Sequence, residues 1–331
     1  MPFPAWIIEK QGDSVAGRLA QLTHEELPPG EVLIRVEASS LNYKDALAAA
    51  GHPGVVRKFP HVPGIDAAGR VEASDSPEFS VGDCVLVTGR ELGVSHYGGW
   101  AGYIRVPADW AVPLPAGLSL REAMALGTAG FTAGQCVDAL VRHDVSPAAG
   151  PVLVTGATGG VGSLAVAILA KLGYRVAALT GKAESHEWLR ALGASEILSR
   201  EEFTALGDRP LLKAQFAGGV DTVGGETLSR LMRSLEYRGC VAACGMVGGD
   251  ELRVSVFPFI LRGVTLVGID SAACPREPRL EIWRKLAGEW KPDGLDRLTE
   301  TVPLAEIESQ LAKIRRGGIQ GRVVVLPWGT E

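Results

Sequence analysis

The sequence contains the stretch Val152-Leu-Val-Thr-Gly-Ala-Thr-Gly-Gly-Val-Gly162. Together with Pro151, its first residues form an apolar run typical of a buried strand, and the glycines that follow predict a tight turn. An apolar helical pattern continues from Ser163 to Leu172 and ends at Gly173, and a second strand-like run covers residues 174–179. The order strand, turn, helix, strand predicts one βαβ unit with a dinucleotide-binding turn at its first junction.

The glycines of this turn have separate expected roles. Gly159 lets the backbone approach a pyrophosphate, and Gly162 lets the helix pack closely against the strand. The usual three-glycine spacing is not met, because Ala157 occupies the first position and an extra glycine, Gly156, stands one place earlier. On the glycines alone, an ordinary tight turn stays open as an alternative. A helix start presents free N–H groups and a positive dipole end to a phosphate. The residues expected to bind the phosphates are Thr158, Gly159, Gly160 and Val161.

The end of the second strand indicates which dinucleotide binds. An NAD site is expected to place Asp or Glu about 20 residues after the glycines, where the carboxylate holds the ribose 2′-hydroxyl. This chain has Thr180-Gly181-Lys182 at that point, followed by Ser185. The Lys182 ammonium group would attract a 2′-phosphate, and the Thr180 and Ser185 hydroxyls would donate to it, so NADPH is the favoured cofactor. The alternative is that Lys182 is solvated and Glu184 binds the ribose.

Length and composition limit the class of protein. A chain of 331 residues suggests two domains, and 46% hydrophobic residues allow two cores. The net charge of -5 does not indicate a nucleic-acid-binding surface. The five cysteines are scattered, which is typical of unpaired thiols in a reducing cytoplasm. No secretory signal pattern and no bilayer-length apolar run occur, so we expect a cytoplasmic protein with no membrane or nucleic-acid partner.

The two parts of the chain have different patterns. Residues 1 to about 120 read as short strands punctuated by Gly and Pro, as in a small barrel. After the glycine turn, apolar strands without polar alternation are predicted at 220–223 and 239–245, as expected of a parallel sheet covered on both faces. A helix at 278–290 then leads to a closing strand at 321–326. The pattern predicts an α/β protein.

This order of barrel, nucleotide domain and short barrel return resembles the medium-chain dehydrogenase/reductase superfamily over essentially the whole chain. Within the superfamily, the runs Leu-Asn-Tyr-Lys-Asp, Thr-Gly-Lys and Gly-Cys-Val-Ala-Ala-Cys-Gly are similar to the acrylyl-CoA reductase branch (AcuI/YhdH), whose members are often named quinone oxidoreductases. The segments that carry the resemblance are Ser39-Ser-Leu-Asn-Tyr-Lys-Asp45, Pro60-His-Val-Pro-Gly-Ile-Asp66, Gly127-Thr-Ala-Gly-Phe-Thr132, the glycine turn and Gln320-Gly-Arg322.

The resemblance implies a fold, an assembly and further site residues. A GroES-like β-barrel substrate domain is expected over residues 1–122, completed by about 300–331, and a Rossmann doubly wound parallel-sheet NADPH-binding domain over 123–299. Relatives often form homodimers by pairing an edge strand of the nucleotide sheet, for which residues 264–269 are the apolar candidate here. Arginines suit phosphate because guanidinium binds it bidentately. The further cofactor contacts implied are Tyr43, Arg200, Met246, Ile260, Ser271 and Arg322.

The alcohol dehydrogenases of this superfamily carry a catalytic zinc, and residues that would bind it are missing here. Their ligands include a Cys in the segment equivalent to Asn42-Tyr-Lys44 and a Gly-His-Glu, where this chain has Gly64-Ile-Asp66. Cys240 and Cys244 read as buried apolar thiols and not as metal ligands. Without a Lewis acid, alcohol oxidation is disfavoured. Reduction of a polarised carbon–carbon double bond needs a hydride, hydrogen-bond donors to the forming enolate and a proton for the α-carbon.

The candidate hydrogen-bond donors lie in the segment Asn42-Tyr-Lys-Asp45. Tyr43 offers a hydroxyl and an aromatic face at the nicotinamide, Asn42 offers an amide N–H to an oxyanion, and Asp45 can orient Tyr43 or Lys44 or relay a proton. The alternative is structural, with Asn42 capping a helix that starts at Tyr43 and Asp45 supporting its first turn. The resemblance favours the catalytic role for Tyr43 and leaves Asn42 and Asp45 open between the two.

Three functions follow from this pattern. The first is NADPH-dependent reduction of a short enoyl-CoA, acryloyl-CoA to propionyl-CoA, and the second is an NADPH:quinone oxidoreductase. Both substrates accept hydride at an electron-poor alkene, so the sequence barely separates them. The third is a non-enzymatic NADPH-binding protein, against which the retained Asn42-Tyr43 pair argues mildly.

Overall fold

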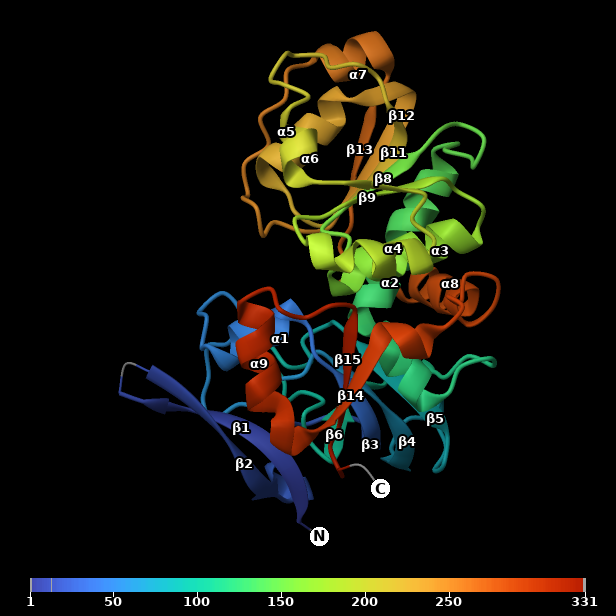
Figure 1. The fold of residues 1–331 in the computed structure, drawn as a ribbon. Coiled ribbons are helices and arrows are strands. Elements are labelled where there is room, and N and C mark those ends of the chain that lie inside the picture. The colour runs from blue at the N-terminus through green and yellow to red at the C-terminus, as the bar shows by residue number, and fades with distance from the viewer. Residues whose placement is uncertain (1, 13, 330–331) are drawn as a thin grey trace. The chain divides into compact units, whose positions relative to one another are not determined.

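The run at Val152–Thr155 forms strand β8 near the middle of a six-stranded sheet (Figure 1). The computed structural model describes residues 2–12 and 14–329. The sheet has the order β10-β9-β8-β11-β12-β13, and every neighbouring pair is parallel. The order reverses at β8, and a ligand binds at such a switch point in doubly wound sheets. The other strands are β9 (Val176–Leu179), β10 (Glu196–Leu198), β11 (Phe216–Asp221), β12 (Leu235–Ala243) and β13 (Thr265–Gly268).

The central strands of this sheet are buried on both faces, as their apolar sequences predict. Every residue of β8, β9 and β11 is buried. On one face, Leu228, Leu231 and Met232 of α6 and Phe203 of α5 belong to the same apolar cluster as Leu153 of β8. The helices of this part are α3 (Gly160–Lys171), α4 (His186–Ala191), α5 (Arg200–Thr204), α6 (Gly225–Arg233) and α7 (Phe257–Arg262), with a short 3-10 turn η3 (Ala183–Ser185).

The first part of the chain forms a second sheet with the order β14-β15-β3-β4-β5-β7, in which β6 also pairs with β3. Its pairs are antiparallel apart from β14 with β15. Alternate residues Val32, Ile34 and Val36 of β3 are buried in its core. The strands are β3 (Val32–Ser40), β4 (Asp66–Ser74), β5 (Cys84–Thr88), β6 (Tyr103–Val106), β7 (Val112–Pro113), β14 (Thr299–Pro303) and β15 (Arg322–Leu326), and β1 (Phe3–Gln11) and β2 (Ser14–Leu22) form a separate hairpin.

Strand β15 completes this sheet from the end of the chain. It pairs with β14 on one side and with β3 on the other, and all five of its residues are buried. Just past the end of β3, the Leu41 N–H also donates to the Val323 carbonyl at 3.0 Å. The remaining helices of this part are α1 (Tyr43–Ala49), α8 (Arg276–Ala287) and α9 (Ile307–Arg315), with 3-10 turns η1 (His24–Glu26), η2 (Ala108–Trp110), η4 (Leu295–Leu298) and η5 (Leu304–Glu306).

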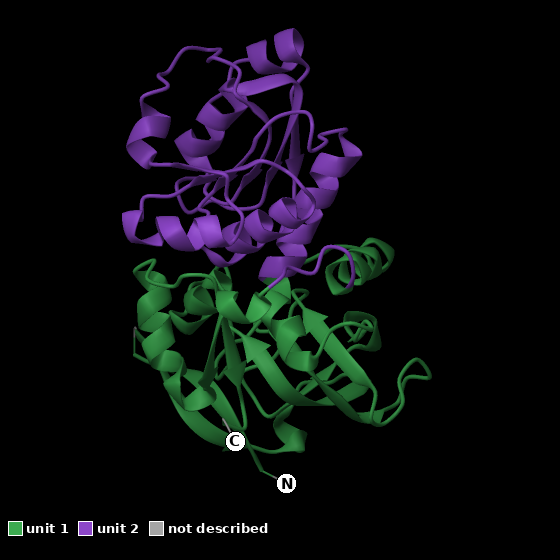
Figure 2. Ribbon diagram, turned by 45° about the vertical axis from the view of Figure 1, so that its right-hand side comes forward, with its two compact units in different colours: residues 1–128, 272–287, 294–331 green, residues 129–271, 288–293 purple. Residues whose placement is uncertain are grey.

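The contacts divide the chain into two units (Figure 2). Unit 1 comprises residues 1–128, 272–287 and 294–331, and unit 2 comprises residues 129–271 and 288–293. Helix α2 (Leu120–Arg142) bends at Gly127, whose φ of 54° and ψ of -156° are not helical, and the unit boundary follows at residue 128. The segment 272–287, which includes α8, belongs to unit 1 by its contacts, whereas the sequence placed it in the nucleotide domain. None of the described helices is long and apolar enough to span a membrane.

Candidate active site

The glycine-rich turn joins β8 to α3. Gly156 has a φ of +59°, in the left-handed region that favours glycine, so the extra glycine makes the turn. A Cβ on Gly162 would lie 2.3 Å from the Gly156 carbonyl oxygen, and glycine therefore lets the helix start pack on the turn. Gly159 is the N-cap of α3, and the nearest atom to a Cβ there would be 3.4 Å away. The first N–H groups of α3 have no carbonyl partner one turn earlier, so the turn fits a dinucleotide pyrophosphate.

A buried polar group supports this turn from β11. The Asp221 carboxylate accepts hydrogen bonds from the Thr155 hydroxyl at 2.7 Å and from the Gly224 N–H at 2.7 Å, and burial raises its pKa. The Thr155 hydroxyl in turn accepts from the Thr222 N–H at 3.0 Å, and the Thr222 hydroxyl donates to the Thr155 carbonyl at 2.8 Å. The sequence did not single out these residues. These hydrogen bonds join the carboxyl ends of β8 and β11, and the glycine turn starts directly after β8.

The end of β9 gathers the residues predicted to select the dinucleotide. The Thr180 hydroxyl accepts from the Lys182 N–H at 3.1 Å, and Ser185 is fully buried just beyond. A Cβ on Gly181 would lie 2.8 Å from Nε of Arg200, so the Arg200 side chain lies directly over this glycine. Lys182 and Arg200 thus place two cations at the strand end where an NAD site carries an acid. Glu184 is exposed within η3.

The three other contacts predicted in unit 2 come from two ends of the sheet, because Met246 and Ser271 follow the carboxyl ends of the neighbouring parallel strands β12 and β13, whereas Ile260 lies on α7. Met246 is exposed in the segment after β12, and Ser271 is half-buried beyond β13. Ile260 is 69% exposed on α7. The Arg262 guanidinium at the end of α7 donates to the carbonyl of Leu235, at the amino end of β12, so α7 lies near the opposite end of that strand from Met246. No described contact connects Ile260 to the glycine turn, and its role stays a prediction.

In unit 1, strand register brings distant polar residues together. Ser39 pairs with Ala67 in the antiparallel β3–β4 ladder, which places Ser40 opposite Asp66. Ser40 pairs with Val324 in the β15–β3 ladder, which directs Arg322 toward Asn42. Thr128 follows Gly127, where a Cβ would lie 2.5 Å from Oδ2 of Asp66, so the bend in α2 needs glycine to approach this carboxylate. We call Ser40, Asn42, Asp45, Asp66, Thr128 and Arg322 the polar cluster.

Asp66 is the centre of the polar cluster and is fully buried. Its Oδ2 accepts from the Ser40 hydroxyl at 2.5 Å, from Nδ2 of Asn42 at 2.8 Å and from the Thr128 N–H at 2.9 Å, while Oδ1 accepts from the Thr128 hydroxyl at 2.5 Å. The predicted donor, the Asn42 amide, also donates to the Ser40 hydroxyl at 3.1 Å. The side-chain N–H groups of Asn42 therefore both donate within the polar cluster, to Asp66 and to Ser40. The role of this amide at an oxyanion stays a prediction.

Asp45 lies in the first turn of α1, and its carboxylate caps the start of this helix. Its two carboxylate oxygens accept from the N–H of Asn42 at 2.7 Å and from the N–H of Ile65 at 2.8 Å. Complete burial, followed by the negative charge of Asp66, raises the pKa of Asp45 from 3.8 to about 7. The Asp45 side chain thus holds the first turn of α1 against the segment before β4. With a pKa of about 7, its protonated and ionised forms are both populated near neutral pH.

Arg322 supplies the positive charge of the polar cluster. It is 3% exposed, and its Nε donates to the Ala125 carbonyl at 3.0 Å. Its Nη1 donates to the Leu41 carbonyl and to Oδ1 of Asn42, each at 3.2 Å. Its Nη2 lies 3.9 Å from Oδ2 of Asp66 and has no hydrogen-bond partner within the described ranges. Burial lowers the pKa of Arg322, and the negative charges of Asp66 and Asp45 oppose this effect. One buried donor is thus left over.

Tyr43 is the exposed member of this region. It follows Asn42 as the first residue of α1, is 50% exposed, and stands beside the exposed Lys44. The N-terminal end of α1 is fixed by Asp45 and Asn42, so the backbone that carries Tyr43 is anchored while its side chain faces solvent. An exposed phenol on an anchored helix start can donate a hydrogen bond to a substrate oxygen.

The donor set does not suit a zinc ion. Within residues 2–12 and 14–329, no three His, Cys, Asp or Glu side chains are grouped as metal ligands. At the position of the family's Gly-His-Glu, Asp66 already accepts four hydrogen bonds. The segment equivalent to the Cys ligand holds Asn42 and Tyr43. The residues present therefore do not fit a catalytic zinc.

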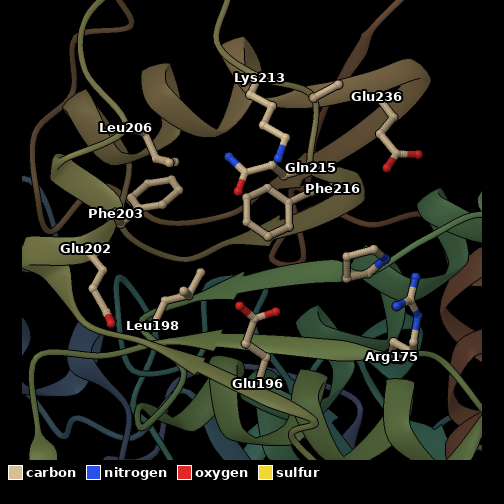
Figure 3. A pocket seen from close by; sticks show the side chains of 12 residues that line it. Arg175, Glu196, Leu198, Glu202, Phe203, Leu206, Lys213, Gln215, Phe216 and Glu236 are labelled. Atoms are coloured by element: carbon tan, nitrogen blue, oxygen red, sulfur yellow. The ribbon is translucent and has the colours of Figure 1, made fainter.

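A cavity of about 380 Å³ lies elsewhere in unit 2 (Figure 3). Its walls come from residues at the amino ends of the parallel strands, among them Arg175, Glu196 and Phe216, and from Phe203 and Leu206 of the α5 region. The glycine turn leaves the opposite, carboxyl end of β8. This cavity therefore contains none of the residues predicted to bind a dinucleotide.

The barrel-type sheet, the doubly wound sheet and the glycine turn are those of a medium-chain dehydrogenase/reductase. Residues 28–116 match the family described as alcohol dehydrogenase GroES-like domain, and residues 160–287 match the family described as zinc-binding dehydrogenase. The acrylyl-CoA reductase AcuI of Ruegeria pomeroyi is 47% identical over 325 residues, which cover 98% of each chain. The putative quinone oxidoreductase YhfP of Bacillus subtilis is 47% identical over 324 residues, again 98% of each chain.

Solved structures agree with these sequence matches. The yhdH oxidoreductase of Salmonella enterica, crystallised with NADP, aligns with a TM-score of 0.95 and 47% identity over 98% of this chain and 99% of that chain. The Bacillus subtilis yhfP structure, with NAD bound, aligns with a TM-score of 0.96 over the same shares. The chain therefore belongs to the acrylyl-CoA reductase (AcuI/YhdH) branch of the medium-chain dehydrogenase/reductase superfamily. The predicted family and fold class are confirmed.

Proposed function

We propose that this protein is an NADPH-dependent oxidoreductase that reduces the α,β double bond of a short enoyl-CoA, with acryloyl-CoA converted to propionyl-CoA. The observation that carries the proposal is the polar cluster, which fixes the start of α1, where Tyr43 is the first residue. It holds an exposed phenol on a fixed helix start and offers no donor set for zinc. The name of the Ruegeria pomeroyi relative supports the same reaction.

In the proposed reaction, residues of unit 2 bind the cofactor and residues of unit 1 hydrogen-bond to the substrate. NADPH, when bound, supplies the hydride that adds to the β-carbon of the alkene. In unit 2, the start of α3 binds the pyrophosphate, and Lys182 and Arg200 bind the 2′-phosphate. In unit 1, the Tyr43 hydroxyl donates to the thioester oxygen as enolate charge develops. Asp45, whose oxygens are both engaged by backbone N–H groups, positions the helix start that carries Tyr43.

A parallel assay separates this function from its alternatives. We expect NADPH oxidation to be faster with acryloyl-CoA than with crotonyl-CoA or a benzoquinone, when the three are compared by kcat/KM. Turnover of the benzoquinone alone would favour the quinone oxidoreductase, the function in the name of the Bacillus subtilis relative. Tight NADPH binding without turnover of any of the three would favour a non-enzymatic NADPH-binding protein.

The cofactor preference depends on the end of β9. We expect Lys182→Ala to weaken NADPH binding by about one to two decades and to leave NADH binding nearly unchanged, because one charge-assisted phosphate contact contributes roughly 1.5–3 kcal/mol. Fluorescence titration of both cofactors measures the change. Lys213→Ala, which removes an exposed lysine from the amino edge of the same sheet, is the matched control. Equal affinity of the native protein for the two cofactors would contradict the assignment.

Activity is expected to need no zinc. Dialysis against a strong chelator should leave turnover with acryloyl-CoA intact, because Asn42, Tyr43 and Asp66 stand where the ligands would be. Metal content and turnover should be measured on the same dialysed sample. A loss of turnover in proportion to the metal removed, restored by added zinc, would overturn this prediction.

We expect a homodimer in solution. Among the strands that the structure describes, β13 ends the unit 2 sheet with an unpaired edge, and such edges need a partner or a cover. Apolar side chains are exposed on α7, which precedes it, namely Phe257, Phe259, Ile260 and Leu261. Light scattering at micromolar concentration should give twice the chain mass of 34.8 kDa. A monomer under those conditions would count against the assembly.

A further inference from the structure

Three exposed cations of unit 1 have no role in the reaction described above. Arg57 and Lys58 are adjacent in the loop after α1, and Lys10 lies near the end of β1. No Asp or Glu occurs at residues 46–65, so this part of the sequence carries positive charge without a carboxylate beside it. Among the residues that the structure describes, none of the three cations forms an ion pair, and Arg57 donates from its Nε to the Pro53 carbonyl at 3.4 Å. We call Lys10, Arg57 and Lys58 the basic group.

Strand pairing brings the basic group together. Ile8 and His61 form an antiparallel bridge, in which the Ile8 N–H donates to the His61 carbonyl at 2.8 Å and the His61 N–H donates to the Ile8 carbonyl at 3.0 Å. Two residues further along, in opposite chain directions, Lys10 therefore faces Phe59. The Lys10 Nζ lies 5.7 Å from the centre of the Phe59 ring, within the range of a cation–π contact. The other two cations directly precede Phe59 in the chain, so the register brings the whole basic group to one part of the surface.

Helix α1 connects Tyr43 to the basic group (Figure 1). Gly51, which follows α1, is packed against Phe59, because a Cβ on this glycine would lie 3.6 Å from Cζ of that ring. At about 1.5 Å per residue, Tyr43 and Gly51 are about 12 Å apart along the helix axis. Tyr43, Leu47 and Ala50 share one face of the helix, at i, i+4 and i+7, and each is exposed or half-buried. An accessible and largely apolar helix face thus leads from Tyr43 toward the basic group.

We propose that the basic group is the binding site for the phosphates of a CoA thioester, whose pantetheine arm lies along the exposed face of α1. This inference rests on the proposed function, because it places the thioester oxygen at the Tyr43 hydroxyl. The arm between the thioester sulfur and the diphosphate spans roughly 15 Å when extended, which is enough to pass along α1. CoA carries a diphosphate and a 3′-phosphate, to which Arg and Lys donate charge-assisted hydrogen bonds. A quinone has no phosphate, so the basic group selects CoA thioesters over quinones.

The test compares two substrates with the same reacting end. S-acryloyl-pantetheine has the alkene, the thioester and the arm of acryloyl-CoA, but it lacks the phosphates and the adenosine. In the Arg57→Ala/Lys58→Ala variant, KM for acryloyl-CoA should rise about tenfold with kcat unchanged, because exposed charged contacts each contribute modestly and act on binding alone. KM for S-acryloyl-pantetheine should be the same in both proteins. Added salt should raise KM for acryloyl-CoA more in the native protein than in the variant, because salt screens exposed charges.

Two further variants make the result specific. Arg57→Lys/Lys58→Arg keeps both positive charges and should retain the native KM for acryloyl-CoA. Arg18→Ala removes an exposed cation of the same hairpin, which is paired with Glu9 at 2.8 Å, and should leave KM unchanged for both substrates. An equal rise in KM for acryloyl-CoA and S-acryloyl-pantetheine in Arg57→Ala/Lys58→Ala would overturn the proposal, because the lost contact would then not be to the nucleotide end.

Calorimetric titration with free CoA tests the site without turnover. The full-length protein is first saturated with NADP⁺, so that the nucleotide cannot bind at the glycine turn. We expect the native protein to bind CoA and the Arg57→Ala/Lys58→Ala variant to bind it about tenfold more weakly. No binding of CoA by the native protein, or equal binding by both proteins, would overturn the basic group as the phosphate site. A native protein that binds CoA in this way and does not reduce acryloyl-CoA would support the site and count against the proposed function.

Discussion

Tyr43→Phe should lower the turnover of acryloyl-CoA on the order of a hundred- to a thousand-fold while NADPH still binds. The substitution removes the hydroxyl that donates to the thioester oxygen and keeps the ring, and loss of one preorganised oxyanion donor typically costs about 2.7–4 kcal/mol. Tyr43 is half exposed, so the change leaves no cavity in the core of unit 1. Stopped-flow or steady-state NADPH oxidation gives kcat, and fluorescence titration gives the NADPH affinity. Full activity would leave Tyr43 as a stacking surface without a hydrogen-bonding role.

Asn42→Ala is the companion variant, because it separates the two roles of its amide. A helix cap alone is worth about 1 kcal/mol. In the structure the Asn42 amide also bonds Asp66 and Arg322, so its removal should cost more than that in free energy of unfolding. If the amide also shares the oxyanion, turnover per folded enzyme should fall as in Tyr43→Phe. An unchanged turnover with a lowered thermal midpoint would make Asn42 a structural residue.

The stability of unit 1 should fall as pH rises between about 4 and 7 because of Asp45. In the native protein its pKa is about 7, whereas in the unfolded chain it is near the ordinary value of 3.8. Within that window the native state holds the proton and the unfolded state does not, so the free energy of unfolding decreases with rising pH and levels off above about 7. Between about pH 5 and 7 this amounts to roughly 2 kcal/mol. Urea unfolding at a series of pH values measures it.

Asp45→Asn is the control for this dependence. An amide keeps one acceptor oxygen and places an N–H₂ group against a backbone N–H, so the variant should be less stable at low pH, by about 1–3 kcal/mol. The gap between native protein and variant should then narrow as pH rises, because only the native side chain loses its proton. Carboxylates that are remote from Asp45 titrate equally in both proteins and cancel in the difference. Parallel curves for the two proteins would contradict the shifted pKa of Asp45.

The parts of the fold that the sequence predicted are those with a local signal. The apolar run before the glycines became β8, the helical pattern became α3, and the apolar run at 239–245 fell largely within β12. The hairpin of β1 and β2 was not predicted individually. Its residues Trp6 and Gly17 pack together only because the strands pair in register, with a Cβ on Gly17 lying 1.9 Å from the Trp6 ring. Such a contact depends on the pairing of two strands, so it produces no periodic pattern in the sequence of either strand.

The candidate site divides in the same way. Asn42, Tyr43 and Asp45 could be selected because they are adjacent in the sequence, and so could Thr180 and Lys182. Asp66 could not be selected as their partner from spacing, although the quoted Pro-Gly-Ile-Asp66 segment contains it, because its neighbours Ser40, Thr128 and Arg322 come from three other elements. The β3–β4 and β15–β3 registers bring them together. Residue pairing between strands, and not residue type, was the missing information.

The place of β15 has a consequence for biosynthesis. During translation, β3 emerges early, but the strand that pairs with its last residues, Ser39 and Ser40, is encoded some 280 residues later, so at about 5–20 residues per second this end of β3 waits for tens of seconds. Residues 129–271 are complete before then, and unit 2 can form while unit 1 is still unfinished. The carboxylates of Asp45 and Asp66 likewise have no Arg322 to compensate them until the last strand arrives. The end of β3 thus stays without this partner strand while the chain is on the ribosome, and the polar cluster is completed only when β15 has been made.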